Sequence, residues 1–310
     1  MSFYSTLSSV IPNDLLSWLK NKLHIMEINN MMIRIMSNNQ WWSDTNKPGW
    51  EKMGLDCSAK VRVPGFHRMF AETNADIIGL QECSMVMADL HMRGLSESGS
   101  GYALLWGRDT PILYKTDKFE LVDSSYLVYP TEVPGFEGEF NNLNTKSYCI
   151  AVFRSKENGK MIVFGTTHLW YMSSNPNWKH YQSGSDEARQ YQLGIMMDKV
   201  DEFIEKYNCP GIIVGDMNAY ATSPAIKDAN SRGYIGAASL ATDYADDGNG
   251  YHKCDADGYS PYVPGDPNRA LDHILVKNAP DGFVKRFDRF KEEYYMPLSD
   301  HLPVYIDVEL

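Results

Sequence analysis

The spacing of apolar residues predicts helices that alternate with strands toward both ends of the chain and strands through its middle. Apolar side chains recur at helical spacing between residues 11 and 25, so we predict a helical extension over residues 1–30. The remainder, residues 31–310, contains no linker-like stretch and is predicted to form the main domain. Within it, helices are predicted over residues 66–73 and 185–207, the second from a long amphipathic stripe.

Short apolar or alternating runs predict the strands. They cover residues 32–36, 77–80, 103–106, 111–114, 119–129, 148–154, 161–167, 212–214, 271–276 and 304–308. Asn158-Gly159 favours a tight hairpin between two of them. Helices alternate with strands at both ends while hairpins fill the middle. This order predicts an α/β fold, a four-layer sandwich of two mixed β-sheets packed face to face and flanked by helices.

Composition and charge narrow the possible functions. The chain has 310 residues and a formal net charge of -11, which argues against nonspecific coating of nucleic acid by Lys and Arg. An enzyme that meets phosphate through a metal ion is still compatible with this charge. The five cysteines include no CxxC pair, which indicates free thiols in a reducing compartment. No signal peptide or membrane span is expected, so we predict a cytoplasmic protein, and no obligate protein partner is indicated.

Polar side chains gather at the ends of the predicted strands, where α/β folds place their sites. The candidate functional residues are Asn39, Glu82, His168, Asp216, Asn218, Asp272, Asp300 and His301. Most of them offer carboxylate or amide oxygens, and none is a thiolate. Oxygen ligands favour a hard cation such as Mg²⁺, with Mn²⁺ possible, over Zn²⁺.

Six motifs, in order, resemble those of the endonuclease/exonuclease/phosphatase superfamily. They are Met36-Ser37-Asn38-Asn39, Ile77-Ile78-Gly79-Leu80-Gln81-Glu82, Thr166-Thr167-His168-Leu169, Val214-Gly215-Asp216-Met217-Asn218, Leu271-Asp272-His273-Ile274-Leu275-Val276 and Ser299-Asp300-His301-Leu302-Pro303-Val304. The match spans about residues 32–310. The resemblance implies that residues 31–310 form a catalytic domain that hydrolyses phosphoesters with Mg²⁺.

The resemblance also implies roles for individual residues. Glu82 would be the main metal ligand, with Asn39 and Asp300 nearby, so that the ion offsets charge on a phosphoryl oxygen. By its offset from the strand, Asn39 fits this role better than Asn38, because a shift of one residue reverses the face of a strand.

The catalytic roles implied for the other residues concern water and phosphate. Asp216 would position or deprotonate the attacking water, and Asn218 would hold the water or the phosphate. His301 would contact the phosphate or act as acid and base, while Asp272 fixes its tautomer and His168 donates from the opposite side. Whether Asp216 or His301 takes the proton is left open by the sequence.

Substrate identity is the least determined property. A phosphodiesterase acting by in-line attack of water is the first prediction, and a phosphomonoesterase acting on a nucleotide, sugar or inositol phosphate is the alternative. Nucleic acid is a possible partner, although the net negative charge of the chain does not indicate one. Lys146, before a strand, and Trp178, in a loop of interleaved aromatic and basic residues, are candidate substrate contacts.

Three further readings compete with this one. A binding module that has lost catalysis would share the fold but lack some of the ligands. A thiol hydrolase could pair Cys83 with His168. The segment from Asp255 to Gly258 faintly resembles a calcium loop but lacks its remaining ligands.

Overall fold

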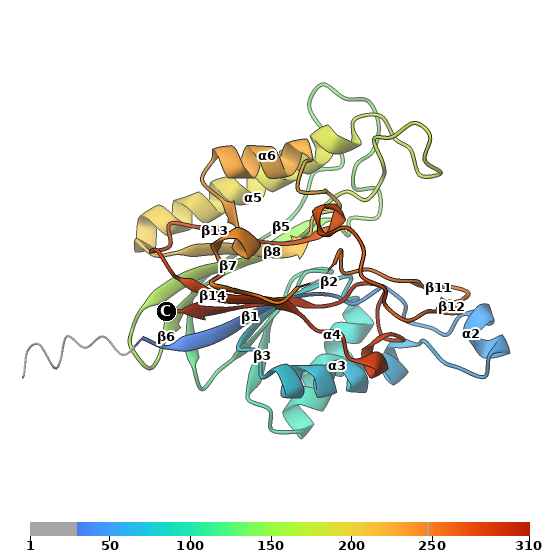
Figure 1. The fold of residues 1–310 in the computed structure, drawn as a ribbon, viewed down its shortest axis with the longest axis horizontal. Coiled ribbons are helices and arrows are strands. Elements are labelled where there is room, and N and C mark those ends of the chain that lie inside the picture. Colours follow the sequence, from blue (N-terminus) through green and yellow to red (C-terminus); the bar gives the residue numbers. More distant parts are fainter. Residues whose placement is uncertain (1–29, 247) are drawn as a thin grey trace, which may run out of the picture.

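The computed structural model describes residues 30–246 and 248–310. The predicted N-terminal helix over residues 11–25 lies outside the described residues. Two large β-sheets pack face to face, and helices cover both outer faces, so the fold is the predicted four-layer α/β sandwich (Figure 1). No helix in the described part of the chain is both long enough and apolar enough to cross a membrane.

The first sheet has seven strands in the order β10-β14-β15-β1-β2-β4-β3. Their bounds are β1 Met32–Asn39, β2 Ile77–Gln81, β3 Tyr102–Leu105, β4 Ile112–Lys115, β10 Asp243–Tyr244, β14 Val284–Arg289 and β15 Val304–Glu309. β1 pairs in parallel with β2 and antiparallel with β15, so the sheet is mixed.

The second sheet has six strands in the order β5-β6-β7-β8-β13-β9. They are β5 Phe119–Val128, β6 Ser147–Ser155, β7 Met161–His168, β8 Gly211–Asp216, β9 Ile235–Gly236 and β13 Asp272–Lys277. β7 and β8 are parallel, whereas β6 and β13 run antiparallel to their neighbours. This sheet is also mixed, as predicted.

Apolar residues from both sheets form the central core, which includes Ile35, Ile77, Phe164 and Val214. The sheets approach closely at Gly79 of β2. A Cβ there would lie 2.6 Å from Val214 Cγ2 and 2.7 Å from Thr166 Cβ. A side chain at this position would therefore push β2 away from β7 and β8 and force the two sheets apart, because packed interiors leave no room for added atoms.

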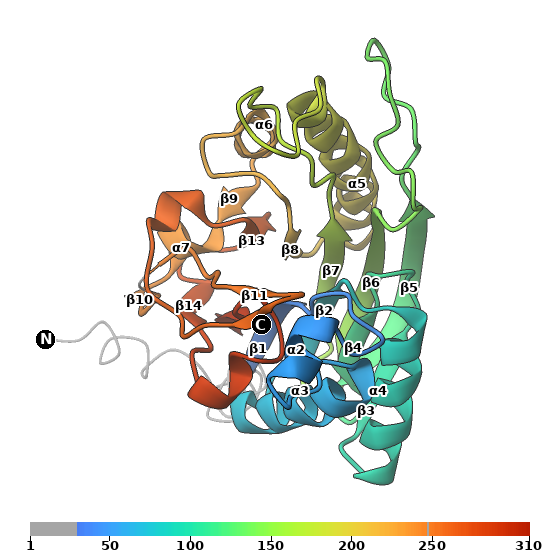
Figure 2. The same cartoon turned by 90° about the vertical axis from the view of Figure 1, so that its right-hand side faces the viewer.

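Four helices cover the outer faces (Figure 2). α3 (Ala59–Thr73) and α4 (Met85–Glu97) lie on the seven-stranded sheet, where their apolar residues pack with those of β1, β2 and β4. α5 (Ser185–Tyr207) and α6 (Pro224–Ser231) lie on the six-stranded sheet. Short elements complete the chain: α2 (Pro48–Lys52), α7 (Ala237–Leu240), and the hairpin of β11 (Cys254–Asp255) and β12 (Gly258–Tyr259).

The structure corrects several element predictions. α5 has the predicted bounds, but α3 begins at Ala59 rather than at residue 66 and accommodates Pro64 within it. α4 and β14 were not predicted. The residues of the faint calcium-loop match instead form the hairpin β11-β12.

Candidate active site

Strand register aligns several predicted residues along one edge of the six-stranded sheet. Ser147 pairs with His168, His168 pairs with Asp216, and Asp216 pairs with Asp272. Lys146 directly precedes Ser147, so one continuous row carries a lysine, a histidine and two aspartates. The edge is formed by the carboxyl ends of β7 and β8, where the parallel pair ends.

Gly215 shapes this edge. Its φ is 151°, and a Cβ there would lie 2.0 Å from the carbonyl oxygen of Thr167. Only glycine fits between β7 and β8 at this point. The close approach places Asp216, the next residue, beside His168, with 3.6 Å between Asp216 Oδ2 and His168 Nε2.

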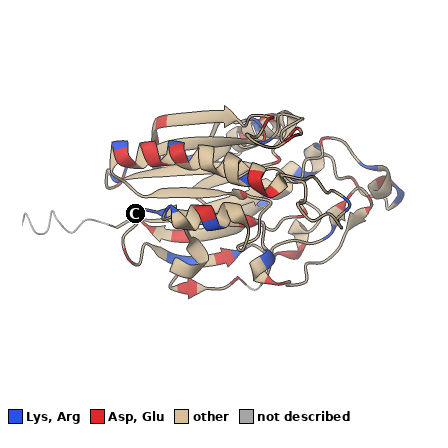
Figure 3. Cartoon of the chain, turned by 90° about the horizontal axis from the view of Figure 1, so that it is seen from above, with Lys and Arg blue, Asp and Glu red and all other residues tan. Residues whose placement is uncertain are grey.

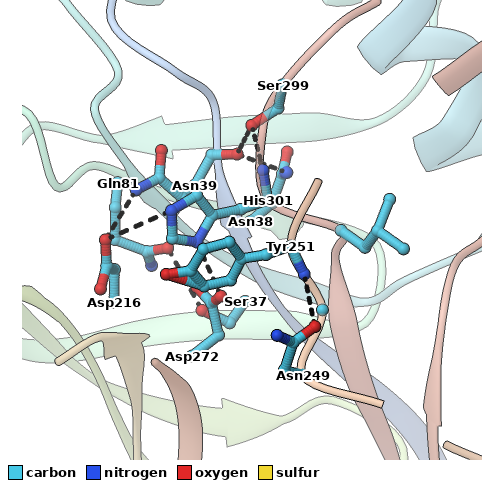
Figure 4. A network of polar contacts seen from close by, with 12 residues as sticks. Ser37, Asn38, Asn39, Gln81, Asp216, Asn249, Tyr251, Asp272, Ser299 and His301 are labelled. Atoms are coloured by element: carbon cyan, nitrogen blue, oxygen red, sulfur yellow. Dashed lines mark hydrogen bonds and ion pairs between the residues drawn. The ribbon is translucent and has the colours of Figure 1, made fainter. Parts of the chain in front are cut away.

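Asn39 and Glu82 come from the other sheet and face Asp216. Asn39 Nδ2 donates to Asp216 Oδ2 at 3.0 Å (Figure 4). It also donates to Glu82 Oε1 at 3.3 Å. Glu82 Oε2 accepts from the backbone N–H of Trp42 at 2.7 Å, and Asn39 Oδ1 accepts from that of Trp41 at 2.9 Å. The site therefore lies across the junction of the two sheets.

Asn38 points to the other side of β1. Its Nδ2 donates to the hydroxyl of Tyr295 at 2.6 Å, within the layer beneath α3. Alternation along the strand thus separates the two asparagines, and Asn39 is the one beside Glu82.

The segment before β15 is tied to the end of β1. Ser299 Oγ donates to the carbonyl of Asn39 at 2.7 Å and accepts from the N–H of His301 at 3.1 Å. His301 Nδ1 lies 2.8 Å from Asp272 Oδ2, and its Nε2 lies 3.8 Å from Asp216 Oδ2. Asp272 thus holds the imidazole at Nδ1, and Nε2 faces the carboxylate of Asp216.

Tyr251 is a site residue that the sequence analysis missed. Its ring stacks on the His301 imidazole, with centroids 5.2 Å apart and an interplanar angle of 24° (Figure 4). The backbone also pairs these two residues in an isolated bridge. Tyr251 lies in a polar loop fifty residues before His301, where no local pattern marks it.

His168 is bonded to Lys146, whose Nζ lies 2.6 Å from His168 Nε2. Both side chains are buried. Burial lowers the pKa of Lys146, and burial together with the lysine charge holds the pKa of His168 well below its ordinary value. His168 is therefore a neutral imidazole that accepts a hydrogen bond from Lys146.

The carboxylates of the site are crowded. Burial raises the pKa of Asp216 to about 6, and burial with the charges of Glu82 and Asp216 raises the pKa of Asp300 to about 7. Burial alone would lower the pKa of His301, but Asp272 and the other carboxylates raise it well above its ordinary value. A cation would offset the repulsion among these carboxylates.

The donor set fits a divalent cation. Ligand atoms of Glu82, His168 and Asp216 all lie within 4.8 Å of one another. Asn39 Nδ2 donates to Glu82 and Asp216 while its Oδ1 accepts from Trp41, and the charge of Glu82 contributes to the raised pKa of Asp300. A group with two carboxylates and one imidazole suits Mg²⁺ or Mn²⁺ better than a thiolate-rich zinc site would.

Asn218, Trp178 and Cys83 have different relationships to this centre. Asn218 donates from its backbone to Asp216 Oδ1 at 2.9 Å, but its side-chain Nδ2 donates to the carbonyl of Leu169. Trp178 is 60% exposed in the loop between β7 and α5. Cys83 packs in the apolar layer beneath α3 and α4, and burial raises its pKa well above the ordinary value, which argues against a thiolate nucleophile.

Comparison with known proteins identifies the family. The sequence profile of the Endonuclease/Exonuclease/phosphatase family matches residues 61–301. The chain belongs to this family. The resemblance that the six motifs indicated is thereby confirmed, and the family is one of phosphoester hydrolases.

Solved structures share the fold over most of their length. An endonuclease/exonuclease/phosphatase family protein of Bacteroides thetaiotaomicron has a TM-score of 0.70 at 19% identity, covering 91% of this chain and 98% of its own. A mannosyl-6-phosphatase of the same organism has a TM-score of 0.66 at 19% identity, covering 88% and 98%. D. rerio TDP2, complexed with a single-strand DNA product, has a TM-score of 0.58 at 18% identity, covering 89% and 98%. No match was found among curated protein sequences.

Proposed function

We propose that the protein is a Mg²⁺-dependent phosphoester hydrolase that acts by in-line attack of an activated water. The observation that carries this proposal is the convergence of Glu82, His168 and Asp216 from both sheets to within 4.8 Å. Independent helix caps or solvated strand ends have no reason to meet in this way, whereas hydrolysis of a phosphoester needs acid, base and cation in one place.

Glu82 is proposed as the main metal ligand, with Asn39 and Asp300 beside it. The ion, when bound, supplies positive charge that polarises a phosphoryl oxygen and stabilises the transition state. Asp216 and His168 lie close enough to Glu82 to respond to the same charge. The metal can be Mg²⁺ or Mn²⁺ on the basis of these donors.

The protein's own residues divide the remaining work. Asp216 is oriented by the Asn218 backbone at Oδ1 and by Asn39 Nδ2 at Oδ2, and its carboxylate is proposed to orient the attacking water and accept its proton. His301, kept charged by Asp272, donates from Nε2 to a phosphoryl oxygen. Lys146 supplies a second positive charge beside His168 on the opposite side.

The substrate is proposed from the sequence to be a phosphodiester, and a phosphomonoester is the second candidate. One observation favours the second: the space beside Glu82 and His168 is a cavity of about 420 Å³, lined also by Lys146. The fold itself occurs both in a mannosyl-6-phosphatase and in TDP2 with a DNA product. Trp178 does not line this cavity, so its proposed role as a substrate contact stays a prediction.

Nucleic acid is not favoured by the charge distribution. Figure 3 shows acidic and basic residues interspersed along the helices that cover the six-stranded sheet, rather than a single basic stripe there. All five cysteines are buried as free thiols, which supports the proposed reducing compartment. A cytoplasmic location stays a prediction.

Replacement of the main metal ligand tests the proposal. Glu82→Gln should abolish the heat of Mg²⁺ binding in calorimetry and lower turnover of a generic aryl phosphoester by about 10³-fold or more, because metal stabilisation is worth several kcal/mol. Glu51→Gln, at an exposed position of α2, is the matched control and should change neither.

Two outcomes would contradict parts of the proposal. Full activity in Glu82→Gln would overturn the assignment of the metal site. Absence of both Mg²⁺ binding and phosphoester turnover in the natural chain would instead support a binding module that has lost catalysis.

A further inference from the structure

The cavity beside the site has a composition that the hydrolytic chemistry does not explain. Glu82, His168 and Lys146 form one part of its lining, and the rest comes from the loop after β1, the loop before β4, the loop before β6 and the loop after β7. Its volume of about 420 Å³ is that of a pocket for a small molecule. Whatever group is esterified to a phosphate at Glu82 and His168 would enter this space.

Two exposed aromatic rings form the walls. Trp42 is 56% exposed, and its backbone N–H is fixed on Glu82 Oε2. Tyr171 is 49% exposed, packs against Trp170 with ring centroids 4.9 Å apart, and has Lys146 Nζ 5.5 Å from its ring centroid. Two exposed aromatic rings that line one cavity offer flat apolar faces on which the ring of a ligand can pack.

Asp109 also lines the cavity, and it is anomalous in two respects. It is 7% exposed, yet its Oδ2 makes no hydrogen bond, one of only two such buried side-chain atoms in the described part of the chain. Its φ is 58°, in the left-handed region that few residues other than glycine adopt, although aspartate does so more readily than most. Buried acceptors without a donor are rare and call for an explanation, such as a ligand group.

The backbone holds Asp109 beside the metal site. The N–H of Cys83 donates to the carbonyl of Asp109 at 3.3 Å, and Cys83 directly follows Glu82. Among described residues other than glycine and asparagine, positive φ occurs at Trp41, Glu82 and Asp109 alone. All three border the site, which is the pattern expected when backbone strain positions functional groups.

The required ligand follows from these groups. The Asp109 carboxylate can accept from hydroxyl or amine donors, the aromatic rings can cover an apolar ring face, and Lys146 and Arg108 add positive charge to a lining that also holds Glu82 and Asp109. A ring with several hydroxyl groups, bonded to the phosphate, meets all three requirements. A second phosphate on the ring would be placed against Asp109, whereas a long polymer would extend beyond the pocket.

We propose that this cavity binds the sugar or cyclitol ring of a small phosphoester, with Asp109 accepting from ring hydroxyls between Trp42 and Tyr171. The proposal rests on the phosphoester hydrolase function proposed above and names its substrate class. The proposal gives a role in substrate selection to Asp109, Trp42 and Tyr171. A site that hydrogen-bonds a substrate hydroxyl discriminates strongly against compounds that lack that hydroxyl.

The test compares substrates by kcat/KM with the full chain and Mg²⁺. The panel contains a hexose 6-phosphate, inositol 1-phosphate, a nucleoside 5′-monophosphate, single-stranded DNA and p-nitrophenyl phosphate, which has no hydroxyl group on its ring. The natural chain should prefer the hexose or inositol phosphate. Asp109→Asn should lower the ratio of sugar phosphate to p-nitrophenyl phosphate kcat/KM by about 10–100-fold, the effect of a hydrogen bond to a charged group.

Asp117→Asn is the matched control, an exposed carboxylate that does not line the cavity, and it should leave the ratio unchanged. Trp42→Ala, at an exposed position, should shift the ratio in the same direction. This variant replaces Asp109→Asn as the test if Asp109→Asn does not fold. An equal loss on both substrates in each variant, or preference for the nucleotide or DNA, would overturn the proposal. Failure to hydrolyse any compound of the panel would instead contradict the hydrolase function itself.

Discussion

Asp272 Oδ2 lies 2.8 Å from His301 Nδ1, across the gap between the first residue of β13 and the segment before β15. The two residues are separated by 29 positions in the chain; Asp272 belongs to the six-stranded sheet, and His301 lies just before β15 of the seven-stranded sheet. This bond fixes the imidazole orientation and leaves Nε2 toward Asp216. The packing of the two sheets therefore determines both the orientation and the protonation state of the His301 imidazole.

Removal of the Asp272 charge should leave the His301 ring in place but make its protonated form less stable. Asp272→Asn keeps the size of the side chain but cannot stabilise an imidazolium, so we expect turnover to fall by about 10²–10⁴-fold, the range of general acid–base contributions. The measurement is kcat on p-nitrophenyl phosphate at saturating Mg²⁺. Asp257→Asn, exposed in the β11-β12 turn, is the control. A loss of less than about tenfold would contradict the role given to His301.

Arg62 should be essential for the loops that carry the metal ligands. Its guanidinium donates to the carbonyls of Cys57, Gln40, Leu298 and Ser43 at 2.6–2.8 Å, while the side chain is buried. Lysine cannot form this fork, so Arg62→Lys should lower the free energy of unfolding by about 3 kcal/mol or more.

Urea unfolding measures the effect of Arg62→Lys, and calorimetry should show weaker Mg²⁺ binding, since Gln40 directly follows Asn39. Arg68→Lys is the matched control on the same helix, because Arg68 is exposed and pairs with Glu72 one turn away. Equal stability of the two variants would show that the four carbonyl contacts contribute little.

Cys83 should be dispensable for catalysis. Its side chain is fully buried in the apolar layer, and burial raises its pKa well above the ordinary thiol value. Cys83→Ala should therefore keep turnover per folded molecule within about twofold, since no thiolate attacks the substrate. A loss of about a hundredfold or more, with the fold intact by circular dichroism, would revive a nucleophilic role for this residue.

Acid should destabilise the fold through His91. This residue is fully buried, with Nε2 3.0 Å from Gln40 Oε1 and Nδ1 3.0 Å from His67 Nε2, and burial lowers its pKa to about 3. The unfolded chain binds this proton near pH 6.5, so the stability contribution is full above that pH and is lost as the pH falls toward about 3.

Urea unfolding at about pH 7.5 and pH 5 measures this linkage. The natural chain should lose about 2 kcal/mol more between the two pH values than His91→Gln, in which no buried imidazole must stay neutral. His180→Gln, at an exposed position, is the control and should follow the natural chain. Identical pH dependence in His91→Gln and the natural chain would contradict the assignment.

The local sequence pattern was sufficient to predict those helices and strands whose apolar residues recur at a constant spacing. α5 has the predicted bounds because its apolar stripe is continuous, and β2 and β8 are unbroken apolar runs. β14 was missed because four of its six residues are charged, and the burial of Arg289 depends on Asp246 from a distant loop. α4 was missed because Met85 and Val86 are exposed, which blurs its apolar face.

The sequence by itself determined the family, the sandwich of two sheets, and the polar residues that end the strands, because periodicity and short motifs are local properties of the chain. Only the tertiary structure decided that Tyr251 stacks on His301, that Lys146 bonds to His168, and that Asp109 borders a cavity beside Glu82. These relationships join segments far apart in the chain. They depend on how the two sheets pack and where their loops meet, which no local pattern encodes.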